Sequence, residues 1–333
     1  MDVIVIGAGI AGVAAAIAAR QAGATVMVIE QRPQPGGVAV VGQHRTICGL
    51  SAIDAPTPEL LEPGATAWWL PRLCAGAPFQ RGRVWLWPTS PTLLSRGLGE
   101  ALSELHIPLH LASTPSITAD GVVTLSGEQW QPTAVIDASG SAWWKDAASR
   151  PARQCGAWRV TLHLQLDESP GAQRAALRRL AHLAPVLALE KITTHQWQLS
   201  IDASEQTAAI AIARQAAVVL GATIQEQTTE IAERDHGGYP GLSLEELFAC
   251  RERGLAWAAW PSEAHDAQGV HWQWPAADRY GCPESLSKPS DAPAWLWCCG
   301  KGLAATPAAA AALRVIGTGL ALGHAVGTRV LTA

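Results

Sequence analysis

Charged residues and metal-binding spacings are scarce in this sequence. Asp, Glu, Lys and Arg make up only 16% of the 333 residues, the formal net charge is -4, and no basic block occurs. We therefore expect no nucleic-acid partner. The cysteines and histidines form no CxxC, HxH or HExxH spacing, so no metal site is predicted. The chain also lacks a GxSxG motif, which leaves hydrolase chemistry without support.

Features of secreted and membrane-spanning chains are also missing. The seven cysteines are odd in number, and the adjacent Cys298–Cys299 suits no ordinary disulfide. The first residues read as a strand without a positively charged segment, so no signal peptide is expected. Pro307 and Arg314 interrupt the longest apolar stretch, residues 298–323, so no transmembrane segment is expected. The sequence therefore predicts a reduced, cytoplasmic protein.

Hydrophobic residues, in contrast, are abundant at 48% of the chain. Such a chain can bury a large core, and disorder is not expected. Its aromatic residues are unusual, because 15 Trp stand against 2 Tyr and 2 Phe. Trp stacks on flat aromatic ligands but also fills cores, and a core role is the usual one. The length suits two domains, or one domain with a large insertion.

The most informative stretch lies at the N-terminus, "MDVIVIGAGIAGVAAAIAARQAGATVMVIEQR". Residues 3–6 predict a short buried strand, residues 11–22 a helix of small residues, and residues 26–29 a second strand that ends in Glu30. Three glycines stand between the first strand and the helix in G-x-G-x-x-G spacing. This order is typical of a strand–turn–helix unit that binds a dinucleotide.

Each fingerprint residue has a mechanical role. Gly7 permits the tight turn, Gly9 lets the backbone approach a pyrophosphate, and Gly12 lets the helix lie close to the strand. The helix N-terminus then offers N–H groups and the positive end of its dipole to the phosphates. Glu30 can accept both ribose hydroxyls and would repel a 2′-phosphate, so the nucleotide should resemble ADP and not NADP.

Together with Ala16 and Gly23, this fingerprint resembles the FAD-binding signature of glutathione-reductase-like flavoproteins. The "DASG" turn after the strand at residues 135–136 resembles the segment that returns beside FAD in those proteins. Later segments are similar to the FAD-dependent oxidoreductases described as the FAD_oxidored family. The matching residues are Gly237, Gly238, Tyr239, Trp260, Pro261, Glu263, Tyr280, Pro283, Leu286, Gly300, Lys301 and residues 314–318. The similarity covers both ends of the chain well but residues 50–90 and 160–230 poorly.

This resemblance implies FAD as the cofactor and a small organic molecule as the substrate. It places His44, Arg45 and Cys48 on the substrate-facing side of the flavin as candidate catalytic residues, with Cys48 as an alternative covalent tether of the flavin. The residues expected to bind the cofactor are Gly7, Gly9, Ile10, Ala11, Gly12, Glu30, Gln31, Arg32, Gly36, Gly37, Val38, Ala138, Ser139, Gly140, Gly300, Lys301, Arg314 and Gly317.

Lys301 departs from the Gly-Asp pair that many other flavoprotein groups carry at this turn. Its ammonium group could pair with the pyrophosphate or a flavin oxygen, or its tip could point to solvent. Arg314 could instead serve as a structural ion-pair partner. A helix that begins near Pro307 is expected to point its N-terminus at the pyrimidine edge of the flavin.

The predicted fold is α/β, with a Rossmann-type, glutathione-reductase-like FAD-binding domain built on a parallel sheet and an inserted α+β substrate domain. Residues 1–153 plus 290–333 form the first domain and residues 154–289 the second, to which residues 50–90 could contribute. Further elements are expected as a helix at 91–105, a strand at 109–112, a hairpin at 121–130, strands at 158–166 and 195–201, and helices at 171–184 and 204–221.

Three functions are compatible with this sequence. The first is an FAD-dependent oxidoreductase that passes a hydride from substrate to flavin and then to oxygen, a quinone or a redox partner protein. The second is a flavin monooxygenase that uses NAD(P)H, although no second G-x-G-x-x-G is present. The third is a maturation or electron-transfer partner that uses FAD structurally.

Overall fold

The computed structural model places two compact units along the chain. The first comprises Met1–Pro151, His236–Ser262 and Gln273–Ala333, and the second Ala152–Asp235 and Glu263–Trp272. Residues 50–90, 236–262 and 273–289 thus group with the N-terminal sheet by contacts, while the functional division into FAD-binding and substrate domains stays a prediction. The structure describes residues 1–140, 153–166, 175, 178, 180, 186–191, 196–203, 205–235, 241–266, 269–290 and 292–332.

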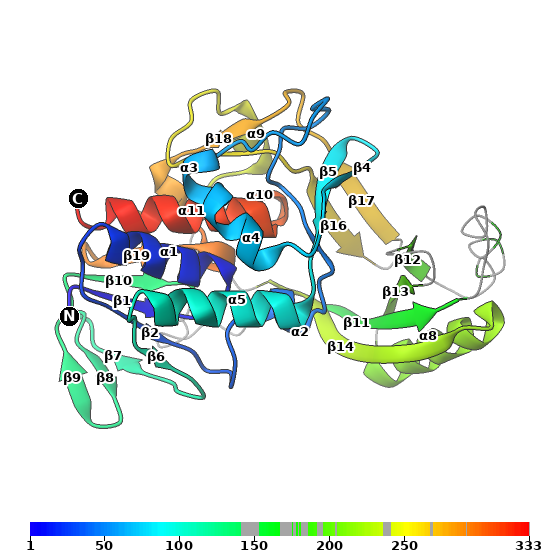
Figure 1. The fold of residues 1–333 in the computed structure, drawn as a ribbon, viewed down its shortest axis with the longest axis horizontal. Coiled ribbons are helices and arrows are strands. Elements are labelled where there is room, and N and C mark those ends of the chain that lie inside the picture. The colour runs from blue at the N-terminus through cyan, green and yellow to red at the C-terminus, as the bar shows by residue number, and fades with distance from the viewer. Residues whose placement is uncertain are drawn as a thin grey trace. The chain divides into compact units, whose positions relative to one another are not determined.

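A five-stranded parallel sheet forms the centre of the first unit, with the strand order β19-β10-β1-β2-β6 (Figure 1). Every residue of β1 and β2 is buried, because both faces of the sheet are covered. This confirms the predicted α/β class with a parallel central sheet. The strands are β1 Val3–Ile6, β2 Val26–Ile29, β6 Leu109–His110, β10 Ala134–Asp137 and β19 Leu296–Cys298.

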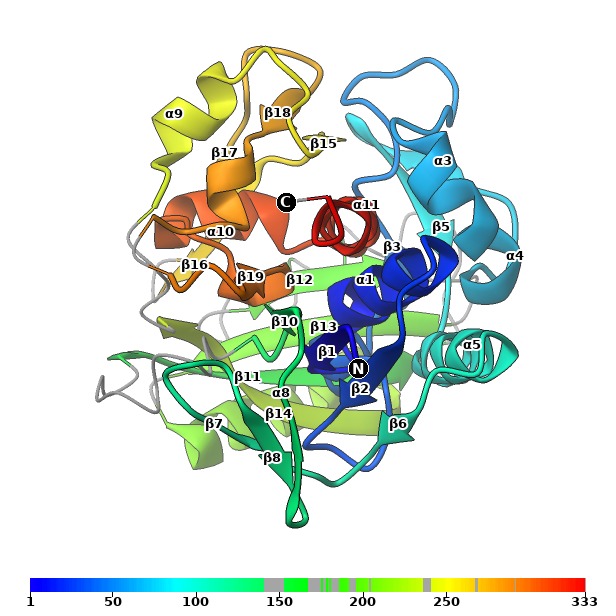
Figure 2. The same ribbon diagram turned by 90° about the vertical axis from the view of Figure 1, so that its left-hand side faces the viewer.

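Alternate residues of these strands enter two separate cores. Val3 and Val5 pack with the helices, whereas Ile4 and Ile6 pack with residues of a three-stranded antiparallel sheet on the opposite face (Figure 2). The three strands of that small sheet are β7 Ser116–Ile117, β8 Val123–Leu125 and β9 Glu128–Trp130. The predicted hairpin at 121–130 is confirmed by the pairing of β8 with β9.

Helices α1, α5 and α11 contribute buried residues to the larger of these cores. The predicted helix at 91–105 is confirmed as α5, where the Ser90 hydroxyl caps the Leu93 N–H and Pro91 takes the first turn. The helices are α1 Ile10–Gln21, α2 Gly37–Val41, α5 Pro91–Glu104, α9 Leu244–Ala249, α10 Pro307–Leu313 and α11 Ile316–Arg329.

The apolar C-terminal stretch differs from expectation. A helix does begin at Pro307, but it ends at Leu313, and a second helix starts at Ile316 after a bend of 93°. Val315 between them is extended, with φ -76° and ψ 153°, so the helical hydrogen bonds cannot continue through it. Among the described residues no single helix has the length and composition to cross a membrane; α10 and α11 meet the criterion only as this bent pair.

Short elements complete the first unit. Residues 50–90 form three short helical segments and a hairpin. These elements are β3 Thr46–Ile47, α3 Pro63–Thr66, η1 Ala67–Trp69, α4 Leu70–Leu73, β4 Phe79–Arg81, β5 Val84–Pro88, β15 Ala256–Ala258, β18 Tyr280–Cys282, η2 Glu284–Leu286 and η3 Gly300–Gly302.

The second unit is a four-stranded antiparallel sheet, β12-β13-β11-β14, whose apolar residues pack on helix α8. The predicted strands at 158–166 and 195–201 and the helix at 204–221 are confirmed, and Gly221 ends the helix in a left-handed conformation. The predicted helix at 171–184 and the residues Gly237–Tyr239 lie almost entirely outside the described residues. The elements are β11 Arg153–Gln165, β12 Val186–Lys191, β13 Gln196–Ala203, α8 Gln206–Leu220 and β14 Thr223–Asp235, and β16 Ser262–Asp266 pairs with β17 Gly269–Gln273.

Candidate functional site

The order of the strands locates the candidate site. From β1 the chain proceeds to β2 and β6 on one side and then crosses to β10 and β19 on the other. In open α/β sheets, ligands bind outside the carboxyl ends of the strands at such a switch point. Here it lies between β1 and β10, so the turns that follow these strands, residues 7–12 and 138–140, flank it.

The three fingerprint glycines have different surroundings. A Cβ on Gly7 would lie 2.5 Å from the carbonyl oxygen of Ala138, and one on Gly12 would lie 2.1 Å from the carbonyl oxygen of Gly7. Both glycines are therefore required by packing between the turns and α1. A Cβ on Gly9, in contrast, would meet no heavy atom within 4 Å. This position is open at the N-terminus of α1, as a pyrophosphate-binding glycine should be.

Glu30 ends β2 beside this opening. It is buried, and its two carboxylate oxygens accept hydrogen bonds from the backbone N–H groups of Ala8, at 2.6 Å, and Arg32, at 2.8 Å. Each oxygen can accept one further hydrogen bond, since a carboxylate offers about four acceptor positions. The carboxylate is thus held at the fingerprint turn with capacity left for two ribose hydroxyls.

The segment after Glu30 returns to the fingerprint. Gly36 donates its N–H to the carbonyl of Ala8 at 2.8 Å, and a Cβ on Gly37 would lie 3.1 Å from the Cα of Gly9. The structure thus brings these two predicted site residues to the open position. Val38 follows on α2 with 40% of its surface exposed. The side chains of Gln31 and Arg32 are also exposed.

The turn after β10 meets the turn after β19. The Asp137 carboxylate is fully buried and accepts hydrogen bonds from the N–H and hydroxyl of Ser139, at 3.0 and 2.7 Å, which orders this turn. Gly140 has φ +75°, and a Cβ there would lie 3.6 Å from the Cβ of Lys301. Lys301 is itself exposed. The first carbon atoms of its side chain thus lie near Gly140, at the edge of the site.

The closing side of the site is formed by the N-terminus of α11. Gly317 donates its N–H to the carbonyl of Cys48 at 2.9 Å, and a Cβ on Gly317 would lie 2.6 Å from that oxygen. The hydroxyl of Thr318 is fully buried and finds no hydrogen-bond partner in the described part of the chain. A buried polar group of this kind calls for a ligand or ordered water.

Helix α11 also packs directly against α1, the helix that follows the fingerprint turn. Cβ atoms on Gly323 and Gly327 would lie 2.2 and 2.1 Å from the carbonyl oxygens of Ala11 and Ala15. The two helices therefore touch backbone to backbone along one face, as small residues at four-residue spacing allow (Figure 1). Ile10 and Ala11, both predicted site residues, are buried in this contact, and a Cβ on Gly300 would lie 3.4 Å from the Ala11 methyl.

The three candidate catalytic residues lie around strand β3. Cys48 follows the strand, half-buried at the N-terminus of α11. Arg45 precedes it, also half-buried, and its carbonyl accepts the N–H of Thr89 at 2.8 Å. His44 is exposed. Arg314 is the C-cap residue of α10 and lies at the bend between α10 and α11, not in the fingerprint turn at residues 7–12.

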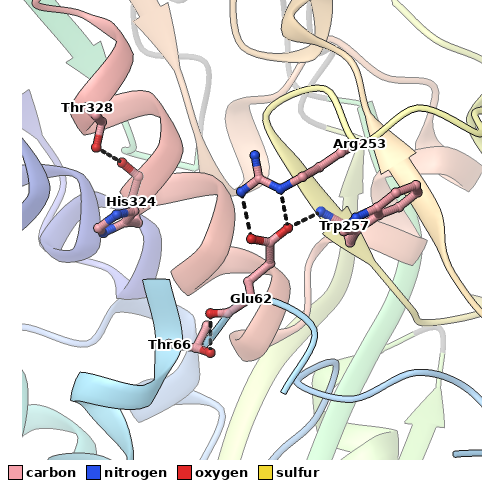
Figure 3. Close-up of polar contacts among 6 residues, drawn as sticks. All are labelled: Glu62, Thr66, Arg253, Trp257, His324 and Thr328. Atoms are coloured by element: carbon pink, nitrogen blue, oxygen red, sulfur yellow. Dashed lines mark hydrogen bonds and ion pairs between the residues drawn. The ribbon is translucent and has the colours of Figure 1, made fainter. Parts of the chain in front are cut away.

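One polar cluster was missed by sequence reasoning. Glu62 is buried and accepts hydrogen bonds from Arg253 and from the backbone N–H of Trp257, next to His324 of α11 (Figure 3). Burial lowers the pKa of His324, which Glu62 raises and Arg253 lowers to smaller extents. The partners are separated by 191 residues in the sequence, so no local spacing signals the cluster.

The adjacent cysteines serve the core. Cys298 packs on one face of the sheet and Cys299 on the other, and both are fully buried. Burial, and secondarily Asp137, raises the pKa of Cys299, so this thiol stays protonated. Over the described ranges, no three His, Cys, Asp or Glu side chains gather into a group that could hold a metal ion.

Three comparisons place the chain among known proteins. Residues 2–153 match the family of FAD dependent oxidoreductases. A stretch of 62 residues is 47% identical to sarcosine oxidase subunit alpha of Corynebacterium sp. (strain U-96), which covers 18% of this chain and 6% of that protein. This chain therefore spans only a small part of that curated relative.

Two solved structures are similar to this chain at low sequence identity. The Diels-Alderase PyrE3 of pyrroindomycin biosynthesis is 12% identical with a TM-score of 0.49, over 91% of this chain and 59% of its own. The anhydrotetracycline hydroxylase OxyS from Streptomyces rimosus is also 12% identical, with a TM-score of 0.48, over 91% of this chain and 56% of its own.

Proposed function

Because residues 2–153 match the family of FAD dependent oxidoreductases, we propose that this chain is a flavoenzyme that oxidises a small organic substrate. The observation that carries the proposal is the open position at Gly9, at the N-terminus of α1 and at the switch point of the sheet. FAD is the cofactor of this family. The buried carboxylate of Glu30 suits its adenosine ribose, as described above.

Two sets of residues would hold the cofactor. Backbone N–H groups around Gly9 would bind the pyrophosphate, with Gly36 and Gly37 beside it. The N-terminus of α11, with the buried Thr318 hydroxyl, would face the pyrimidine edge of the flavin, where its dipole stabilises negative charge. This assigns to α11 the role that the sequence analysis gave to a helix from Pro307.

The flavin supplies acceptance of a hydride when it is bound. The chain's own residues would bind and orient the substrate at the strand β3 side of the site. Arg45 offers a fixed positive charge for an anionic substrate group. The imidazole of His44 can donate or accept a hydrogen bond with the substrate. Cys48, whose carbonyl accepts the Gly317 N–H at the N-terminus of α11, would contact the substrate or carry a covalent flavin bond.

The absorption spectrum of the purified protein is the first test. We expect the visible bands of oxidised flavin, either directly or after incubation with FAD. A colourless protein that also takes up no added FAD would contradict the proposal. Mass spectrometry of the denatured protein tests the covalent bond to Cys48. Complete release of the flavin on denaturation would exclude this bond.

The reductant separates the alternative functions. We propose that electrons come from the substrate, and that oxygen, a quinone or a partner protein reoxidises the flavin. Mixing with NADH or NADPH under argon should then leave the flavin band unchanged. Bleaching of the band would instead favour a monooxygenase, whereas a stable stoichiometric partner without any turnover would favour a maturation or electron-transfer role.

A further inference from the structure

An ion pair between buried Glu62 and exposed Arg253 joins two distant segments of the first unit. The Arg253 guanidinium donates to Glu62 through Nε, at 2.8 Å to Oε1, and through Nη2, at 2.6 Å to Oε2. The Trp257 N–H donates to Oε1 at 2.7 Å (Figure 3). The Glu62 side chain is only 10% exposed, whereas that of Arg253 is 51% exposed. Glu62 is thus fixed by three donors, two of them charged.

From Glu62 a short path leads to the candidate flavin edge. The next residue back, Leu61, donates its N–H to the carbonyl of Leu50 at 2.8 Å. Residues 50–61 are therefore closed into a loop whose two ends are hydrogen-bonded together. Just before this loop, the Cys48 carbonyl accepts the N–H of Gly317, the second residue of α11.

Residues Cys48 and Gly49 pack closely against α11. Gly49 has φ +76°, and a Cβ there would lie 2.6 Å from the Val315 side chain and 3.2 Å from the Thr318 hydroxyl. The Thr318 hydroxyl is the buried group without a hydrogen-bond partner among the described residues. A small shift of residues 48–49 would therefore change the N-terminus of α11.

Arg253 provides a rigid anchor for the pair. Its carbonyl accepts the N–H of Cys282 at 3.1 Å, and the Leu255 N–H donates to the Cys282 carbonyl at 2.7 Å. A Cβ on Gly254 would lie 2.3 Å from that same carbonyl. The segment that carries Arg253 is thus fixed to strand β18, which pairs with β15.

We infer that Glu62 and Arg253 are positioning residues, which hold the Cys48–Gly49 segment against the N-terminus of α11 and so set the environment of the flavin's pyrimidine edge. The part that concerns the flavin rests on the proposed function; the part that concerns Cys48 does not. An apolar pair could fill the same space, but it could not bind the Trp257 N–H or fix the direction of the Glu62 backbone.

The same segment contains a matched control. Asp54 accepts three hydrogen bonds from Arg83, at 3.0, 3.1 and 2.6 Å, so it too has a bidentate arginine partner. The two side chains are 57% and 45% exposed, and the pair joins Asp54 to the hairpin of β4 and β5. Exposed pairs of this kind contribute little to stability. Asp54→Asn should therefore leave Cys48 undisturbed.

The experiment compares Glu62→Gln with Asp54→Asn. The rate at which iodoacetamide alkylates Cys48 is measured by peptide mass spectrometry, first without FAD and then with FAD bound. In Glu62→Gln we expect alkylation of Cys48 to be about tenfold faster than in the wild type, because the charge-assisted bonds that fix residue 62, next to the end of the loop, are lost. We also expect the reduction potential of bound FAD to shift in this variant and not in Asp54→Asn.

Cys299 serves as an internal reference, because it is fully buried in the core beside the central sheet. The inference is overturned if Cys48 and the flavin potential behave as in the wild type, or if Cys299 is accelerated as much as Cys48. If Glu62→Gln does not fold, Arg253→Lys is tested in its place. This variant keeps the positive charge but cannot form the bidentate hydrogen bonds to Glu62. It should accelerate Cys48 in the same direction, and an unchanged rate would overturn the inference. A wild type that binds no FAD would refute the proposed function, while the alkylation without FAD would still decide the position of Cys48.

Discussion

Replacing Gly9 with alanine tests whether the open position at the fingerprint is where the cofactor binds. Gly9 has φ -69° and ψ 175°, a conformation that alanine adopts without strain. The new methyl group would meet no heavy atom of the described chain within 4 Å. The folded protein without cofactor should therefore be as stable as the wild type, or more stable by about 0.4–1 kcal/mol because the unfolded chain loses freedom.

The affinity for FAD should fall nevertheless. A methyl group in the path of the pyrophosphate would lengthen or break at least one N–H bond to a phosphate oxygen, and hydrogen bonds to charged groups contribute about 1.5–3 kcal/mol. At 1.4 kcal/mol for each factor of ten, the dissociation constant should rise about 10- to 150-fold. Gly12→Ala offers the contrast, because its Cβ would lie 2.1 Å from the Gly7 carbonyl oxygen and should destabilise the fold itself.

Two measurements on the same samples separate these effects. Thermal unfolding of the protein without cofactor reports on the fold, and titration with FAD, followed by flavin fluorescence, reports on binding. We expect Gly9→Ala to keep the melting temperature and to lose affinity, and Gly12→Ala to lose melting temperature. A Gly9→Ala protein that binds FAD as tightly as the wild type would refute the placement of the pyrophosphate at Gly9.

Two further predictions concern α11. Gly323→Ala places a methyl group 2.2 Å from the Ala11 carbonyl oxygen, so overpacking should destabilise the fold by about 1–3 kcal/mol, partly offset by about 1 kcal/mol of helix propensity. Urea unfolding should therefore show a lower midpoint for this variant. Gly319→Ala is the control and should not lower the midpoint, because the nearest atom to its new methyl group lies at 3.7 Å. Because burial lowers the pKa of His324 below 6.5, the unfolded chain binds the proton more readily, and the wild type should lose stability as the pH falls below about 6.5. His324→Gln should remove this part of the slope in urea unfolding at pH 5–7, and an unchanged slope would contradict it.

Local patterns in the sequence predict much of this fold. The glycine spacing, the flanking apolar runs and Glu30 correspond to β1, α1 and β2, because each depends on residues close in the chain. Helix α8 likewise ends at Gly221 as expected, since a left-handed residue there terminates the helix.

Other features depend on contacts between distant segments and could not be read locally. The bend at Val315 interrupts an apolar run, and the Gly317 N–H beyond it binds the carbonyl of Cys48, which is distant in the sequence. The Glu62–Arg253 pair joins residues that no spacing rule connects. For Lys301, the sequence left open whether its tip reaches the cofactor, and the structure adds that its stem lies by Gly140 while the residue is exposed. Whether the candidate site residues bind FAD stays a prediction.

The backbone contact between α1 and α11 also bears on how the protein is made. The fingerprint emerges from the ribosome early, whereas the helix that packs on Ala11 and Ala15 emerges some 300 residues later. Until then the small-residue face of α1 has no partner from α11, and exposed apolar surface of this kind favours aggregation. Contacts of such long range form late in folding. FAD loading should therefore follow synthesis of α11, and α1 should be a segment that chaperones protect on the nascent chain.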